Sequence, residues 1–84
     1  MNRKAIVLPY VAYQNEPSRP LAELVDIDED NLRKECHQLF LKVFKGYDFS
    51  IGEIATCQLY TTDKYGDVSY GNGDMWIFLT YVNQ

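Results

Sequence analysis

The chain has 84 residues, a length that suits one small domain, and we expect a single domain over residues 1–84. Hydrophobic residues make up 46% of the chain and charged residues 24%, which excludes an intrinsically disordered protein. The net charge of −4 excludes a generic phosphate-binding protein, which would carry basic clusters, so we expect no direct binding of nucleic acid.

Residues 4–13, KAIVLPYVAY, predict the first strand, because β-branched and aromatic residues dominate them. Alternation predicts that one face carries Ile6, Leu8, Tyr10 and Ala12, and that the other carries Val7, Val11 and Tyr13. Pro9 has no N–H for a ladder, so we expect an edge strand, a bulge or a strand end there. The apolar run is much shorter than the ~20 residues of a membrane span. We therefore expect no membrane contact and a cytoplasmic protein, in the host cytoplasm if the chain is viral.

Residues 14–20, QNEPSRP, predict a surface loop from their Pro, Asn and Ser content. The next segment, residues 21–27 with the sequence LAELVDI, fits either a short helical turn or a short extended piece. We expect a loop there, with one turn of helix at residues 20–24.

Residues 28–46, DEDNLRKECHQLFLKVFKG, have the clearest helical periodicity of the chain. Asp28 is suited to cap the start, because its carboxylate can accept hydrogen bonds from the free N–H groups of the first turn. Gly46 follows the last turn, where a glycine commonly ends a helix. The apolar residues recur at a spacing that forms one stripe along the helix: Leu32, Cys36, Leu39, Phe40 and Val43.

An acidic stretch, residues 23–30, leads into this helix and contains no basic residue. Its acids are Glu23, Asp26, Asp28, Glu29 and Asp30. One interpretation is a patch that meets a basic partner by imitating the charge of nucleic-acid phosphates. The other is that these acids cap the helix, complement its dipole and keep the chain in solution.

Two more strands are predicted after the helix. Residues 51–62, IGEIATCQLYTT, alternate between an apolar face with Cys57 and a semi-polar face with Tyr60. Residues 75–82, MWIFLTYV, are apolar in both alternations. Such a strand is usually central in its sheet, or its second face is covered by something else.

Between these strands, residues 63–74, DKYGDVSYGNGD, are the richest in turn-forming residues. They fit one long hairpin loop, or two tight turns around a short strand at residues 68–70, which would be a fourth strand. Asp63, Asp67 and Asp74 do not follow the order of an EF-hand, so we interpret them as turn-forming residues rather than calcium ligands.

These elements predict an α+β fold of two layers, with the order strand, helix, strand, strand. The sheet would be mostly antiparallel and three-stranded, with the helix packed on one face. A right-handed crossover through the helix would make the first two strands parallel. We expect residues 75–82 in the middle, the strand of Pro9 at one edge and residues 52–62 at the other. The second face would then need a cover from residues 21–27 and the glycine-rich loop, from another protein, or from self-pairing.

Cys36, His37 and Cys57 lack the paired spacing of a zinc site, and the glycines form no nucleotide-binding loop. We expect the two cysteines to be buried free thiols. A chain of this size with one histidine leaves little room for a catalytic pocket. We therefore expect no enzyme activity, no metal and no cofactor.

Seven tyrosines on a small acidic chain suggest a contact surface. In size, acidity, tyrosine content and lack of a catalytic motif, the chain resembles the small accessory inhibitors that phages encode, anti-CRISPR proteins among them. The resemblance is one of composition, rests on no motif and transfers no residue. It implies an inhibitor that blocks a partner protein, for example one with a basic nucleic-acid-binding surface. The residues expected to bind that partner are the five acids of residues 23–30 together with Tyr65, Asp67 and Tyr70. The alternative is a self-assembling structural subunit, a homodimer through a sheet edge or face.

Overall fold

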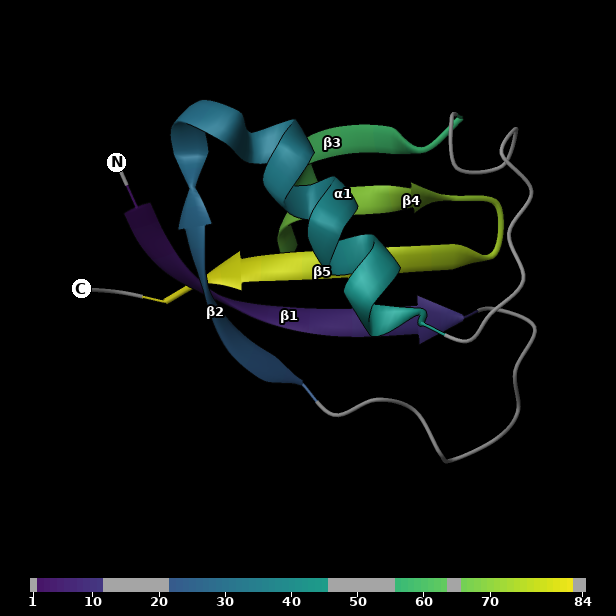
Figure 1. Cartoon of the computed structure of the whole chain (residues 1–84), viewed down its shortest axis with the longest axis horizontal. Coiled ribbons are helices and arrows are strands. Elements are labelled where there is room, and N and C mark those ends of the chain that lie inside the picture. Colours follow the sequence, from purple (N-terminus) through teal and green to yellow (C-terminus); the bar gives the residue numbers. More distant parts are fainter. Residues whose placement is uncertain (1, 12–21, 46–55, 64–65, 83–84) are drawn as a thin grey trace.

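A computed structural model describes residues 2–11, 22–45, 56–63 and 66–82 and shows one helix packed on a five-stranded antiparallel sheet (Figure 1). The strands are β1 (Asn2–Val11), β2 (Glu23–Asp28), β3 (Gln58–Asp63), β4 (Gly66–Asn72) and β5 (Met75–Tyr81). The helical segment begins with a 3-10 turn, η1 (Glu29–Asn31), and continues as α1 (Leu32–Val43). The order across the sheet is β2-β1-β5-β4-β3. The predicted α+β class and the helix on one face are confirmed, but the sheet has five strands where three were expected.

The segment before the helix is a strand, so the prediction of a loop with a helical turn was wrong. β2 pairs antiparallel with β1, from Asn2 opposite Asp28 to Val7 opposite Glu23. Within β2, Ile27 is fully buried while Leu24 is 57% exposed, which is the two-residue period of a half-buried strand. Pairing with β1 decides the conformation of a segment whose local sequence is ambiguous.

The extra strand also overturns the predicted parallel pair. β2 turns back along β1 before the helix begins, and these two strands pair antiparallel. On its other side β1 pairs antiparallel with β5. β1 is therefore an inner strand and not an edge. Pro9 is accommodated because the pairing with β2 ends at Val7, so a proline at this position interrupts no ladder between β1 and β2.

The second half of the sheet agrees better with the sequence. β5 is the central strand and β3 an edge strand, as predicted. The turn-rich stretch contains a full seven-residue strand, β4, rather than a loop or a three-residue strand. β3 starts at Gln58, later than predicted, and residues 51–55 lie outside the described ranges. The same holds for the loop predicted at residues 14–20 and for Gly46.

The core lies between the helix and one face of the sheet. All five residues of the predicted helix stripe are in this core or packed against it. From the sheet, odd-numbered residues of β1 and β5 such as Val7, Ile77 and Leu79 are buried against the helix. The predicted alternation is therefore confirmed as far as Val11, and Ala12 and Tyr13 lie outside the described residues. Within the described residues, no helix has the length and apolar character needed to cross a membrane.

Candidate binding face

The sheet face that points away from the helix carries an apolar and aromatic surface, which we call the open face. Opposite residues of antiparallel strands point to the same side of a sheet, and the register places Leu24 opposite Ile6, and Leu8 opposite Phe78. The same register continues across β4 to β3 at the other edge. The open face consists of Ile6, Leu8, Tyr10, Leu24, Tyr60, Trp76 and Phe78.

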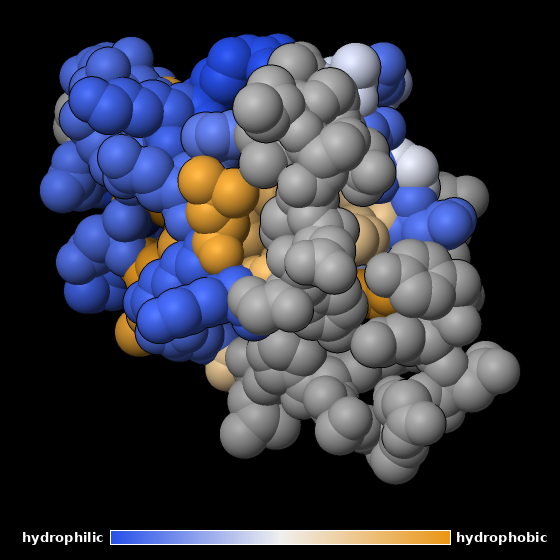
Figure 2. Space-filling model, turned by 45° about the vertical axis from the view of Figure 1, so that its right-hand side comes forward, coloured by the Kyte–Doolittle hydropathy of each residue, from blue (hydrophilic) through white to orange (hydrophobic). Residues whose placement is uncertain are grey.

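Exposed apolar side chains are concentrated on this face. Among the described residues, six large hydrophobic side chains are exposed, and five of them belong to the open face. The exposed fractions of these five are 41% for Ile6, 50% for Leu8, 40% for Tyr10, 57% for Leu24 and 49% for Tyr60. The sixth, Leu41, lies on α1. Seen from the side that carries the helix, most of the described surface is hydrophilic, with a few apolar side chains between polar and grey atoms (Figure 2).

The aromatic side chains of the open face are held by contacts with one another and with the backbone. Tyr10 and Phe78 have ring centroids 5.9 Å apart, and so do Tyr60 and Trp76. The indole N–H of Trp76 donates a hydrogen bond of 2.7 Å to the carbonyl oxygen of Gly73. These contacts fix the rings before any partner arrives, which lowers the entropy cost of binding.

Gly71 makes room for this arrangement. It lies opposite Trp76 in the register, and the indole crosses the place where its side chain would be. A Cβ atom on Gly71 would overlap the carbonyl oxygen of Met75 and lie 2.7 Å from the Cα of Trp76. Because of this close approach, glycine is required here, and the sequence had indicated only a turn.

The acidic stretch is not an isolated patch, because three of its five acids have a basic side chain beside them. Ion pairs join Glu29 to Arg3 at 2.9 Å, Asp26 to Lys4 at 3.3 Å and Glu23 to Lys42 at 3.5 Å. The exposed fractions of these side chains lie between 33% and 65%, so each pair contributes at most about 1 kcal/mol, but the bases reduce the local negative field.

Asp28 has the predicted role of helix cap. Its carboxylate accepts from the backbone N–H of Asp30 at 3.1 Å and from the side-chain amide of Asn31 at 2.8 Å. These bonds, that from Asn31 first, hold the pKa of the Asp28 carboxyl below its ordinary value. Asp30 itself is exposed at the helix start.

Of the other residues predicted to bind a partner, Asp67 lines the same pocket as Glu29, whereas Tyr70 lies apart from the acids. Tyr70 is only 3% exposed and lies in the core, where its ring contacts Phe40. The Asp67 carboxylate accepts from the backbone N–H of Tyr81 at 2.7 Å. Tyr65 lies outside the described residues.

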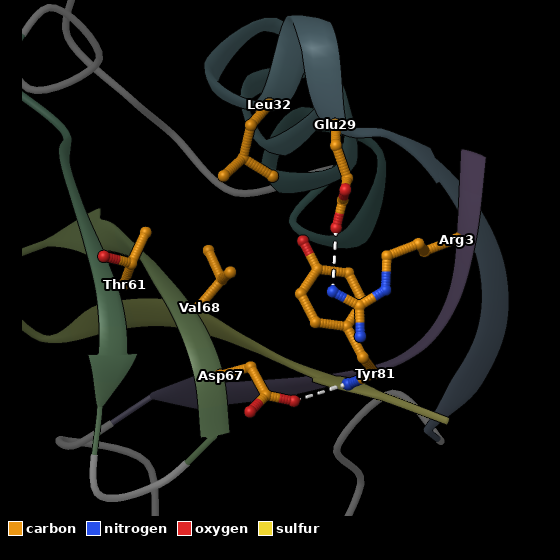
Figure 3. A pocket seen from close by; sticks show the side chains of 7 residues that line it. All are labelled: Arg3, Glu29, Leu32, Thr61, Asp67, Val68 and Tyr81. Carbon is orange, nitrogen blue, oxygen red and sulfur yellow. Dashed lines mark hydrogen bonds and ion pairs between the residues drawn. The ribbon is translucent and has the colours of Figure 1, made fainter. Parts of the chain in front are cut away.

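A small pocket of about 350 Å³ lies between the start of the helix and the ends of β1, β4 and β5 (Figure 3). The Arg3 guanidinium lies 3.8 Å above the ring of Tyr81 and donates to Glu29. Burial, and then the charge of Glu29, raises the pKa of Tyr81. The charged groups thus interact with other groups of the pocket: Arg3 with Glu29, and Asp67 with the Tyr81 N–H. This arrangement ties the helix to the sheet rather than presenting charge to a ligand.

A polar cluster lies between the helix and the sheet and consists of His37, Tyr70 and Cys57. The His37 Nδ1 and the Tyr70 hydroxyl are 2.8 Å apart, and Tyr70 also bonds to the Cys57 thiol. Burial raises the pKa of Cys57, and raises that of Cys36 to about 12. Both cysteines are buried free thiols, as predicted. The described residues contain no group of three His, Cys, Asp or Glu side chains placed to hold a metal.

Comparison of the chain with models of protein families, with curated proteins and with solved structures found no match.

The sequence of β5 had indicated a second apolar face, and the structure confirms that Trp76 and Phe78 lie on it. The sequence did not predict that Leu24 and the even-numbered residues of β1 lie on the same face as Trp76 and Phe78. The alternation in β1 was the available signal, but the neighbour of β1 was not known.

Proposed function

We propose that the protein is a small binding module that docks a protein surface against its open face and performs no chemistry of its own. One observation carries the proposal, namely that five of the six exposed large hydrophobic side chains in the described residues lie on one face. Aromatic residues are enriched at the centres of protein interfaces, and the open face carries Tyr10, Tyr60, Trp76 and Phe78.

The size of the surface supports the same function. The five exposed side chains leave on the order of 500 Å² of surface in solvent, which is at the upper end for the largest apolar patch of a monomer. Covering it would contribute on the order of 10 kcal/mol before the entropy costs of association are subtracted. A surface of this size, held by fixed aromatic rings, suits a stable protein contact.

The buried thiols support the absence of catalysis. A thiolate is the nucleophilic form of cysteine, and the raised pKa of Cys36 and of Cys57 keeps both thiols protonated at neutral pH. Neither cysteine then has the character of a catalytic residue.

The narrower function is inhibition of a partner in the cytoplasm, as the resemblance to phage inhibitors implies. The net charge of −4 favours a partner with a basic surface, such as a nucleic-acid-binding protein. The acids of β2 and of the helix start would speed the encounter, while the aromatic rings of the open face would slow release. Asp26 lies on the same side of the sheet as Leu24, so this acid borders the open face.

Capture of bound proteins from a host lysate, identified by mass spectrometry, tests the proposal. The open-face variant Leu8→Lys should lose the captured protein, whereas Leu41→Lys, which makes the same change at an exposed helix position, should retain it. A third variant combines Asp26→Asn, Glu29→Gln and Asp30→Asn and should bind more slowly, with an effect that fades at high salt. Capture that survives Leu8→Lys but is lost in the acid variant would move the contact surface to the acidic stretch and refute the proposal.

Self-assembly is the second candidate function. The observation in its favour is that the described charges on the open face are few and partly paired, with Lys4 beside Asp26. Such a face does not select a strongly charged partner.

A further inference from the structure

We propose that the occupant of the open face is a second copy of this chain, in a two-fold dimer whose sheets pack face to face. This inference rests on one part of the proposed function, that the open face binds protein, and it assigns a second copy of the chain to that face in place of a basic partner protein. Two antiparallel sheets commonly pack in this way, about 10 Å apart with their apolar faces interdigitated. The dimer would have a helix on each outer side and a second apolar core between the sheets.

The distribution of charge fits a second copy. On β1 and β2, the register places Lys4 and Asp26 on the same side as the open face, and these two form an ion pair of 3.3 Å. Glu23 instead pairs with Lys42 of the helix, so its charge lies on the other side of the sheet. Two open faces can thus meet without opposing large like charges, although the whole molecule carries −4.

The area fits as well. Each copy would bury the exposed parts of its open face together with Trp76, Phe78 and the polar border. The accessible surface buried on the two copies together would be roughly 1,200 Å². This value lies at the lower end of stable, specific interfaces and above most crystal contacts. The described residues of this 84-residue chain form a core on one side of the sheet, and so small a chain gains much stability from a second buried layer.

The two halves of the face also complement each other. Its β2–β1 side is mainly aliphatic, with Leu24, Ile6 and Leu8, and toward β3 it carries Tyr60, whose ring contacts Trp76 of the central strand. A two-fold axis parallel to the strands and over the central strand β5 would place the aliphatic half of one copy on the aromatic half of the other.

Trp76 allows a test on the unmodified protein. It is the only tryptophan of the chain and belongs to the open face, so its fluorescence reports whether that face is covered. We expect sedimentation equilibrium to show a dimer that dissociates on dilution between about 100 and 0.1 µM. Over the same range the emission of Trp76 should shift to longer wavelengths, with an unchanged far-UV circular dichroism spectrum.

Two variants at separate places on the face guard against a simple folding defect. Leu8→Lys on the inner strand and Leu24→Lys on the edge strand should each weaken dimerisation at least about tenfold. The control Leu41→Lys introduces the same charge on the helix and should leave the dissociation constant unchanged. Circular dichroism and the urea midpoint of each variant show whether it is folded.

The outcomes separate this inference from the proposed function. A protein that stays monomeric at the highest concentration overturns the dimer, and the proposed function then stands if lysate capture still depends on Leu8. A dimer that survives both variants, with no change in Trp76 emission, is formed by another surface and also overturns the inference. If the Leu8→Lys and Leu24→Lys variants retain both the dimer and the captured protein, the inference and the proposed function are both refuted.

Discussion

At the scale of single residues, Gly71 is the position where a small change should have the largest effect. Gly71→Ala places a methyl group against the Met75 carbonyl and the Trp76 backbone. Because both obstacles are backbone atoms of the adjacent strand, the sheet itself has to shift, and we expect a loss of about 2–4 kcal/mol in the free energy of unfolding. Urea titration followed by circular dichroism measures this loss.

Gly73→Ala is the matched control for that substitution. Gly73 has a φ of 59° but no atom within 4 Å of an added Cβ, so only the left-handed backbone conformation is penalised. The expected loss is about 1 kcal/mol. If Gly73→Ala were as damaging as Gly71→Ala, close packing under Trp76 would not be the reason for the glycine.

The buried thiols give a second prediction at this scale. With its pKa raised to about 12 by burial, Cys36 should be alkylated by iodoacetamide at pH 8 at least about a hundredfold more slowly than a free cysteine. Cys57 should also be slow, because burial raises its pKa as well. Peptide mass spectrometry over time measures both rates. The same reaction in concentrated urea should be fast, and equal rates with and without urea would contradict the burial of the thiols.

At the scale of elements, the start of the helix depends on Asp28. Asp28→Ala removes the acceptor for the Asp30 N–H and for the Asn31 amide, and should lower the melting temperature by roughly 5 °C. Asp28→Asn retains an acceptor oxygen and should recover most of the loss. A melting temperature unaffected by Asp28→Ala would mean that the helix begins without this cap.

The same carboxylate predicts a dependence of stability on pH. The pKa of Asp28 is lower in the folded chain than its ordinary value of 3.8, so as the pH falls the unfolded chain takes up the proton first. The contribution of Asp28 is therefore complete above about pH 4 and is lost as the pH falls through the folded pKa. Melting curves of the wild type and of Asp28→Asn should converge in this acidic range and differ above it.

The sequence predicted those elements whose local pattern is strong. The helix stripe with Cys36 and Phe40, the cap at Asp28 and the central position of β5 are all readable from neighbouring residues. β2 was missed because Glu23–Asp28 becomes a strand only by pairing with β1, a contact that its own six residues do not encode. That one omission also led to the wrong parallel pairing and to the wrong edge position of β1.

The candidate site was predicted only in part from the sequence, because its extent also depends on contacts between distant strands. Apolar residues in both alternations of β5 indicated a second face, but its extent depends on which strands stand beside β5. The partners of Glu23, Asp26 and Glu29 lie 19 to 26 residues away in the sequence, so their ion pairs required the fold. Composition shows that acids are present, and only the structure shows that bases accompany them.

At the scale of the whole molecule, stability should depend on protein concentration if two copies share the open face. Association that favours the folded chain raises the melting temperature by mass action, so a tenfold increase in concentration should raise it by a few degrees, roughly 2–5 °C. Calorimetry at several concentrations measures this shift. The Leu8→Lys variant should melt at the same temperature at every concentration, and a wild type that also does so would argue against the dimer.

The central place of β5 has a consequence for how the chain acquires its structure during synthesis. β5 lies between β1 and β4, yet in sequence it follows the four other strands that the structure describes. Until the ribosome has released it, the hairpins β1–β2 and β3–β4 have no shared neighbour, and pairing β1 with β5 closes a loop of about 70 residues. The sheet of the nascent protein therefore stays incomplete until β5 emerges, and the apolar surface exposed in that interval favours aggregation unless a chaperone covers it.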